Sequence, residues 1–244
     1  MKHIIGLLCG IMIPLGISAQ SDFGIWASAG AEKKINKNLE VEIEGEFRSR
    51  NNCKTSDRWT IGASAEYKLY KFLKTSAGYD LLYDNNPEKI SYHNNGDYNN
   101  RRQSYWGARH RFHIDLTGNI NFNRFCLSLR ERWQYTYRPE KKTQRYDYDN
   151  EYWEETTVAS KAKNVLRSRL MLEYDFHKID LSPYTSIELY NAWQTDKIRY
   201  TIGIDKSIKK HHVIGLYYRY QNIINNDEDN SDCHILGINY KYKF

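Results

Sequence analysis

From about residue 22 onward, apolar and polar positions alternate along the chain with a period of two. In the run 39–47, for example, the polar positions are four glutamates, Glu40, Glu42, Glu44 and Glu46. Further runs of this kind cover 22–33, 59–69, 74–84, 105–117, 125–137, 164–176, 184–191, 197–208, 213–222 and 232–244. Such alternation is typical of β-strands with one apolar and one polar face, so the pattern predicts an all-β chain.

One residue interrupts this pattern. Glu131 lies on the face of 125–137 that is otherwise apolar. A carboxylate in that place predicts either a β-bulge or a spot that other protein covers.

The connections between the runs fall into two classes. Short connections are expected near 34–38, 71–73, 118–123, 178–180 and 209–211, and mostly longer, polar ones near 51–57, 85–103, 138–162, 192–196 and 225–231. Alternation of short and long connections predicts up-and-down antiparallel strands, with the short turns at one end. No linker or change of composition divides residues 20–244, so we expect a single domain.

Two architectures use strands with one apolar and one charged face. A soluble sandwich turns the apolar face inward, whereas a membrane barrel turns it toward lipid. The barrel is favoured by strands long enough to cross a bilayer, by aromatic residues near strand ends and by a terminal strand that keeps alternating up to Phe244. These aromatic residues are Trp133/Tyr135/Tyr137, Tyr217/Tyr218/Tyr220 and Tyr240/Tyr242/Phe244. We therefore predict an antiparallel up-and-down transmembrane β-barrel of about 10–12 strands in contact with outer-membrane lipid.

The strand count raises a question of parity. Ten strands flank the five long connections, and residues 22–33 add an eleventh. Because single-chain bacterial barrels usually have even strand numbers, either a short strand escapes the pattern or the first segment lies partly inside the lumen.

Composition excludes several other classes of protein. The chain has 244 residues, of which 27% are charged and 14% aromatic, and a mean hydropathy of −0.79. These values exclude a bundle of membrane helices and argue against disorder. A net charge of +6 is too small and too dispersed to indicate nucleic-acid binding.

The first 19 residues resemble a secretory signal in their composition. Lys2 and His3 precede an apolar run from Ile4 to Ile17, and small residues end at Ala19. We expect cleavage before Gln20 and a location in the outer membrane of a Gram-negative bacterium. Three cysteines then remain in the mature chain, of which Cys53 and Cys233 flank long connections and form a candidate disulfide.

Two resemblances support this location. The terminal pattern Gly237-x-x-Tyr240-x-Tyr242 with Phe244 resembles the signal that the barrel-assembly machinery of Gram-negative bacteria recognises. The mature chain is also similar to the bacterial outer-membrane barrels grouped as domain of unknown function 2490. Its motifs are Gly24-Ile25-Trp26, the turn 33–39 leading to Phe47-Arg48-Ser49-Arg50, Arg130-Glu131-Arg132, Leu166-Arg167-Ser168-Arg169, and 181–184 leading to Glu188-Leu189-Tyr190. This resemblance implies the fold and the location, and no activity or site residues.

The face predicted to point into the lumen carries many long charged side chains. We expect them to form a network of ion pairs across a narrow barrel. Its predicted members are Glu40, Glu42, Glu44, Glu46, Glu66, Arg109, Arg111, His113, Asp115, Arg130, Arg132, Arg167, Arg169, Glu173, Glu188 and Arg219. The leading interpretation is that the network fills the lumen and holds the barrel shut. A selective channel for small anionic solutes is the second interpretation.

An outer-membrane lipid-modifying enzyme, either a phospholipase or a lipid A deacylase, is an alternative from another class. Acyl hydrolases need a serine within reach of a histidine. The chain has no His-x-Ser pair, and His110, His113 and Ser128 are the conceivable participants. We therefore assign no catalytic residue.

The segments 85–103 and 138–162 are the best candidates for binding an extracellular ligand, because barrels place contacts in long loops at one rim. Acidic residues of 138–157 lack the spacing of a defined calcium loop, and no cofactor or metal is predicted. Tyr146, Tyr148, Tyr152 and Trp153 could stack on a glycan. The predicted role is thus a narrow or occluded outer-membrane barrel with recognition loops.

Overall fold

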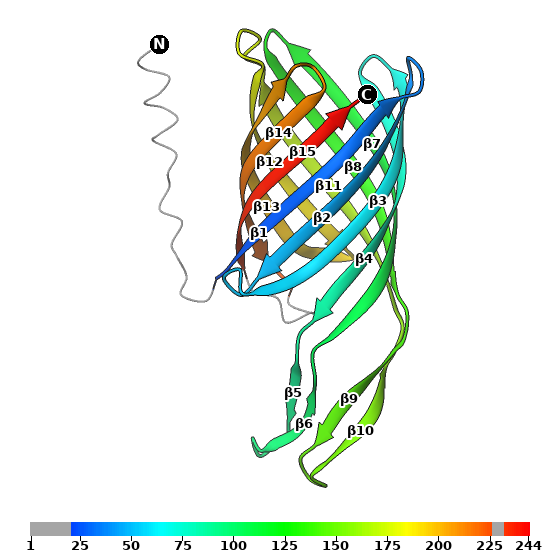
Figure 1. The fold of residues 1–244 in the computed structure, drawn as a ribbon, viewed down its shortest axis with the longest axis vertical. Helices are drawn as coiled ribbons and strands as arrows, with labels where there is room; N and C mark the ends of the chain where they lie inside the picture. Colours follow the sequence, from blue (N-terminus) through cyan, green and yellow to red (C-terminus); the bar gives the residue numbers. More distant parts are fainter. Residues whose placement is uncertain (1–20, 226–231) are drawn as a thin grey trace.

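The structure, a computed structural model, describes residues 21–225 and 232–244, and the predicted signal at 1–19 lies outside them. Eleven of its strands close into one barrel (Figure 1). They are β1 (Asp22–Lys34), β2 (Leu39–Arg50), β3 (Thr55–Tyr70), β4 (Leu73–Asn86), β7 (Tyr105–Phe122), β8 (Phe125–Arg138), β11 (Lys161–Tyr174), β12 (Leu181–Ala192), β13 (Gln194–Ile208), β14 (His212–Ile223) and β15 (Cys233–Lys243). The predicted transmembrane β-barrel is confirmed. No helix in the described parts of the chain is long and apolar enough to cross a membrane.

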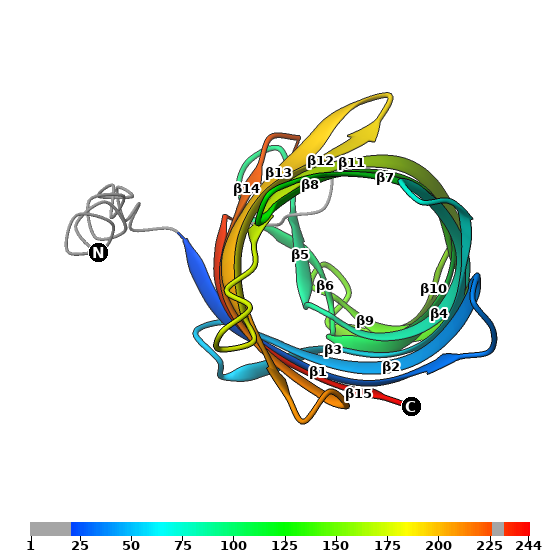
Figure 2. The same cartoon turned by 90° about the horizontal axis from the view of Figure 1, so that it is seen from above.

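The barrel closes through a parallel pair of strands. Every pair that is consecutive around the barrel from β1 to β15 through β2 is antiparallel, so an odd number of strands leaves β1 and β15 running in the same direction. They pair in register from Asp22↔Cys233 to Glu32↔Lys243, and Figure 2 shows the closed ring from above. Both explanations offered for the odd count are therefore wrong: β1 is a complete eleventh strand, and the closure is parallel where an antiparallel one was predicted.

The two longest predicted loops form additional strands. β5 (Lys89–Tyr92), β6 (Tyr98–Arg102), β9 (Lys141–Asp147) and β10 (Tyr152–Val158) make two hairpins. The hairpins join through β6 and β9 into one four-stranded sheet, which we call the β-extension. It projects beyond one rim of the barrel (Figure 1).

Two other connections at this rim are shorter than predicted. Residues 51–54 join β2 to β3, and Trp193 alone joins β12 to β13. The tight β2–β3 turn is held by the Asp22 carboxylate, which accepts hydrogen bonds from the backbone of Asn51 and Asn52 at 2.9 Å each. The fifth connection at this rim includes residues 226–231, which lie outside the described residues.

The polarity of the barrel is the reverse of that of a soluble protein. Large apolar side chains cover its outer surface, with exposed fractions such as 60% for Ile43 and 51% for Leu216. Charged and polar side chains such as Asp115 and Glu188 are buried inside. Aromatic pairs lie near both ends of the outer surface, for example Phe47–Trp59 toward the β-extension and Phe122–Phe125 toward the short turns. Of the two architectures considered, the structure is the membrane barrel.

Some aromatic residues point inward. Trp26, Tyr217 and Ile235 form a small buried cluster in the barrel wall, where the Tyr217 ring packs over Gly237. The absence of a side chain at Gly237 provides the room that this ring needs. Tyr217 was predicted to belong to an outer aromatic girdle, and that prediction is wrong because β14 turns it into the lumen while Tyr218 faces outward.

Glu131 lies on the outer surface without a bulge. The register continues unbroken from Leu116 through Glu131 to Ser168, so the predicted bulge is absent. The Ser168 hydroxyl donates a 2.7 Å hydrogen bond to the Glu131 carboxylate. Phe125 and Tyr137 lie six residues away on either side along β8, about 20 Å each, which places the carboxylate near the middle of the membrane.

A carboxylate at this depth should lower the stability of the barrel. We expect Glu131→Leu to increase the free energy of unfolding by about 1–2 kcal/mol, because it removes a charge from the lipid-facing surface. Ser168→Ala should decrease it by about 1–3 kcal/mol, because it leaves the carboxylate without its donor. Urea unfolding of the refolded barrel in micelles measures both changes, and a loss of stability in Glu131→Leu would contradict this account.

Candidate functional site in the barrel lumen

Two neighbouring rows of inward-pointing residues carry an unusual concentration of cations. The strand registers align Arg130, Arg169, Glu188 and Arg199 in one row across β8, β11, β12 and β13. The second row aligns Asp115, Arg132, Arg167, Tyr190 and Lys197 across β7 to β13. We call the six cations of these rows the cationic belt: Arg130, Arg132, Arg167, Arg169, Lys197 and Arg199.

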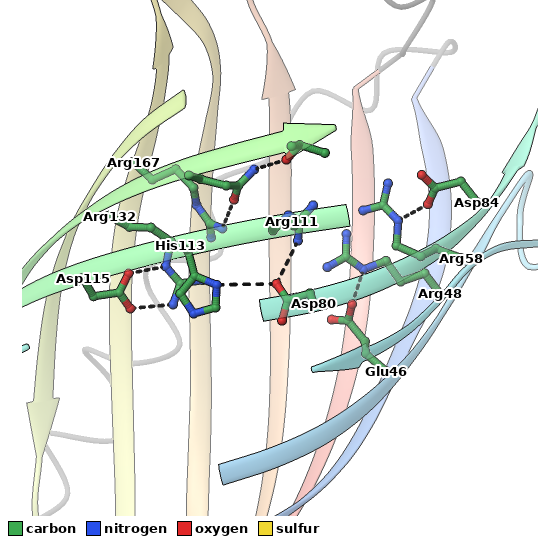
Figure 3. Close-up of polar contacts among 12 residues, drawn as sticks. Glu46, Arg48, Arg58, Asp80, Asp84, Arg111, His113, Asp115, Arg132 and Arg167 are labelled. Carbon is green, nitrogen blue, oxygen red and sulfur yellow. Dashed lines mark hydrogen bonds and ion pairs between the residues drawn. The ribbon is translucent and has the colours of Figure 1, made fainter. Parts of the chain in front are cut away.

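Two carboxylates within the rows bind part of the cationic belt. Glu188 accepts hydrogen bonds from Arg130 at 2.6 Å and from Arg167 at 2.9 Å, and also from the Tyr190 hydroxyl at 3.0 Å. Asp115 accepts two bonds of 2.6 Å from the guanidinium of Arg132 (Figure 3). A two-bond pair of this kind fixes both position and orientation of the arginine.

Three cations of the belt have no such partner. Arg169, Lys197 and Arg199 form no ion pair with a carboxylate among residues 21–225 and 232–244. Arg199 bonds instead to Gln221 at 2.8 Å and to the Tyr190 hydroxyl, while Lys197 lies 4.8 Å from the centroid of the Tyr190 ring. Neutral partners orient Lys197 and Arg199 without neutralising them.

Side chains reach across the lumen at this level. The Arg199 guanidinium lies 5.0 Å from the centroid of the Trp26 ring. Yet three strand spacings around the wall, about 14 Å, separate β13 from β1. The Arg48 guanidinium on β2 lies 3.7 Å from the Trp26 ring centroid, and the two residues are direct partners in the β1–β2 register. The long Arg199 side chain therefore extends over the lumen to a pair of residues on another part of the wall.

A second set of ion pairs lines β3, β4 and β7. Asp84 binds Arg58 and, at 2.8 Å, Arg109. Asp80 lies 3.7 Å from both Arg111 and His113 (Figure 3). These pairs extend the network around the barrel toward the cationic belt, and Glu46 adds a 2.6 Å pair with Arg48.

Most of the predicted glutamates lie apart from the arginines. Glu40, Glu42 and Glu66 pair with the lysines Lys34, Lys241 and Lys74. They lie in the half of the barrel near the short turns, as do Glu44 and Glu173, for which the described residues offer no ion pair. The expected single Glu/Arg network is therefore divided into an acidic half near the short turns and a cationic half near the β-extension.

Arg219 also lies in the cationic half. Its guanidinium donates to the Thr201 hydroxyl at 2.9 Å and lies 5.2 Å from the Trp26 ring centroid. Like Arg199, it is held by neutral groups.

The histidines do not approach Ser128. Strand pairing places His113 opposite Gln134, six residues or about 20 Å along β8 from Ser128, which pairs with Asn119. His110 points outward and bonds to the Tyr79 hydroxyl at 2.7 Å. The conceivable pairing of either histidine with Ser128 is therefore wrong, because the register separates them.

Instead, the His113 ring lies over Gly78. A Cβ atom on Gly78 would be 2.5 Å from two atoms of this ring. The glycine therefore creates the space in which His113 is buried.

The candidate disulfide between Cys53 and Cys233 is not formed, and both thiols are free. The start of β1 lies between them: the Cys53 backbone bonds to Phe23, while Cys233 pairs with Asp22 on the opposite edge. Two strand spacings, about 10 Å, exceed the reach of a disulfide.

Comparison with known proteins assigns the chain to a family. A family profile described as "Protein of unknown function (DUF2490)" matches residues 23–232. The chain belongs to the DUF2490 family. No curated protein matches its sequence.

Two solved structures resemble this DUF2490 barrel. The beta domain of the Bordetella autotransporter BrkA is 12% identical with a TM-score of 0.51, over 83% of this chain and 78% of that one. A NanC porin is 12% identical with a TM-score of 0.45, over 86% of this chain and 93% of that one. At 12% identity, the similarity to the autotransporter domain shows the fold alone. The TM-score for the porin is too low to support any conclusion.

The β-extension of this DUF2490 protein carries a row of aromatic rings in contact with one another. Neighbouring ring centroids are 5.0–5.3 Å apart. The row, which we call the aromatic row, runs through Tyr92, Tyr98, Tyr148, Tyr146 and Trp153, and therefore crosses both hairpins. At the tip of β9 and β10, Asn150 and the Asp149 backbone donate to Asp147 and lower the pKa of its carboxyl. No group of acidic, histidine or cysteine side chains in the described chain is arranged to hold a metal ion.

Several residues of the site were missed in the sequence. Lys197 and Arg199 have an evident signal, because they alternate with Ile198 and Tyr200 in a predicted strand. Trp26 and Tyr190 have a weaker signal: the alternation places them on the polar face, two residues from Ser28 and from Glu188, although aromatic residues are also common on a lipid-facing surface.

Glu188 should be the most sensitive carboxylate of the site. Glu188→Gln removes the acceptor shared by two arginines and leaves uncompensated cations in a confined space. We expect a loss of about 3–5 kcal/mol in the free energy of unfolding. The matched control is Glu155→Gln in the exposed pair with Lys142 on the β-extension, where we expect little change in the free energy of unfolding because solvent screens the pair. Equal losses in the two variants would contradict the site as described.

Proposed function

We propose that the protein is an outer-membrane β-barrel of a Gram-negative bacterium whose lumen is occluded by charged side chains, and which presents the β-extension to the outside. The observation that carries this proposal is the contact of Arg199 on β13 with Trp26 on β1, three strands away around the wall. A general porin needs an unobstructed lumen, which in known barrels takes 16–18 strands.

Burial within the lumen supports the occlusion. The side chains of Arg130, Arg132 and Arg167 are only 12–17% exposed, and those of Asp115 and Glu188 are 6–7% exposed. Charged side chains reach such low exposure only when they pack against one another. A selective channel for small anions remains the second candidate, and the excess of cations in the lumen favours it over a channel for cations.

The location is supported by three independent features. The outer surface is apolar along the strands, aromatic pairs lie near both ends, and the fold resembles an autotransporter beta domain. The predicted signal at 1–19 and a terminal strand ending in Phe244 fit export and insertion by the barrel-assembly machinery. In this orientation the short turns face the periplasm.

The β-extension supports a role in recognition. Both of its hairpins contribute to the aromatic row, and Tyr92, Tyr98 and Trp153 are about half exposed. Aromatic faces of this kind suit a glycan or another partner with apolar faces and polar edges. An enzyme is less well supported, since the register separates His113 from Ser128.

Export and location can be tested together. We expect the mature protein to begin at or near Gln20 and to fractionate with outer membranes. N-terminal sequencing of the protein purified from separated envelope fractions provides the measurement. An intact Met1 in the membrane fraction, or full recovery from the soluble periplasm, would contradict this expectation.

Occlusion can be tested in planar bilayers. The unmodified barrel should show little conductance, whereas replacement of Arg130, Arg132, Arg167 and Arg169 together by Ala should open a measurable one and lower the unfolding temperature. This replacement removes four of the six long side chains of the belt and leaves Glu188 without the two arginines that donate to it. A large, stable and weakly selective conductance of the unmodified barrel would show that the lumen is an open pore.

A further inference from the structure

We propose that the cationic belt binds a small multivalent oxyanion, a solute that carries phosphate or several carboxylate groups. This inference deepens the proposed function, because it assigns a ligand class to the occluded lumen. The site faces the lumen and not the lipid, so the ligand is a free solute and not a membrane headgroup.

The charge balance of the belt is the first argument. Its two rows contain six cations and only two carboxylates, Glu188 and Asp115. Arg219, in the neighbouring row, adds another cation that neutral groups hold. Unpaired charges in a space that excludes much of the water are unfavourable unless a counter-ion compensates them.

The second argument is the placement of like charges side by side. Arg130 pairs directly with Arg169, and Arg132 pairs directly with Arg167, across β8 and β11. Like charges at directly opposed positions of a sheet repel one another. Glu188 compensates Arg130 and Arg167 from β12, but Arg169 receives no ion pair within the described chain. An anion between these side chains would turn the repulsion into attraction.

Unused hydrogen-bond donors form the third argument. The Nε atoms of Arg130, Arg167 and Arg169 are buried and have no hydrogen-bond partner. Buried donors of this kind are rare in folded proteins and call for a partner. Guanidinium groups match the geometry of phosphate and carboxylate oxygens, with two parallel bonds for each pair. A multivalent oxyanion therefore fits the belt better than chloride does.

The distribution of charge along the barrel indicates the direction of entry. Glu44 and Glu173, which form no ion pair among the described residues, lie in the half near the short turns and oppose the approach of an anion from that side. Toward the β-extension, Arg102 and Arg138 carry further buried Nε atoms without partners. Lumen charge of one sign concentrates oppositely charged solutes. The anion is therefore expected to enter from the rim that bears the β-extension.

The test uses the full-length mature barrel in detergent micelles, with inorganic pyrophosphate as the probe. Isothermal titration measures binding, and sodium chloride at equal ionic strength is the reference. We expect saturable binding of pyrophosphate, weaker binding of monovalent acetate, and a rise in the unfolding temperature with pyrophosphate that chloride does not reproduce.

Arg169→Gln is the decisive variant, because Arg169 forms no ion pair whose loss would leave a buried carboxylate. We expect its affinity for pyrophosphate to fall by about tenfold or more, which is the loss of one or two charge-assisted hydrogen bonds. The affinity of Arg169→Lys should lie between those of Arg169→Gln and the unmodified barrel, because lysine keeps the charge but lacks the two parallel donors of a guanidinium group. The matched control is Arg101→Gln, which removes a cation from the exposed pair with Glu88 on the β-extension and should leave the affinity unchanged.

Two results would overturn the proposal. One is a response to pyrophosphate no larger than that to chloride at equal ionic strength. The other is the same affinity in Arg169→Gln, Arg101→Gln and the unmodified barrel. The conductance test separates this inference from the proposed function. An open pore that still binds pyrophosphate at Arg169 overturns only the occlusion, and a closed barrel without binding overturns only the anion site.

Discussion

Closure of the hydrogen-bonded ladder is the constraint on which the rest of this structure depends. In a membrane no water is available to the backbone, so every strand needs a partner on both edges. The eleven strands meet this requirement only through the parallel pair of β1 and β15. Side chains alternate between the two faces of every strand, and closure turns one of these faces to the lumen and the other to the outside. The apolar residues therefore face outward and the charges are confined to the lumen.

Confinement gives the lumen its electrostatic character. On the surface of a soluble protein, water would screen the arginines of β8 and β11 from one another, and their mutual repulsion would be small. Inside the barrel they face one another across short distances, and two carboxylates hold only part of them. Aromatic rings orient some of the arginines where carboxylates usually would. Trp26, Tyr190 and Tyr217 lie against guanidinium groups in this way. The result is a centre whose cations are oriented but only partly neutralised.

Much of the fold is encoded in a period of two, which explains why the strands and their inward charges can be predicted from sequence. The structure places Arg130, Arg132, Arg167 and Arg169 on the inner face, and the pattern indicates this face because their apolar neighbours are unambiguous. Partners across strands are a different matter, since register depends on turn geometry as well as on the pattern. The separation of His113 from Ser128 and the association of two distant hairpins into one sheet depend on contacts between segments that the pattern treats independently. The inward orientation of Tyr217 does not, because it lies two residues from the inward-pointing Arg219 on the same strand.

An odd number of strands has a consequence for how the barrel divides space. Asp22 and Phe244 begin and end the described barrel at opposite rims, whereas an even number would bring both to the same rim. The first and last residues of the barrel wall therefore lie on opposite sides of the membrane. A fluorophore attached beside Asp22 and another beside Phe244 would report separately on the two sides of one membrane, so the orientation of a single molecule becomes directly observable.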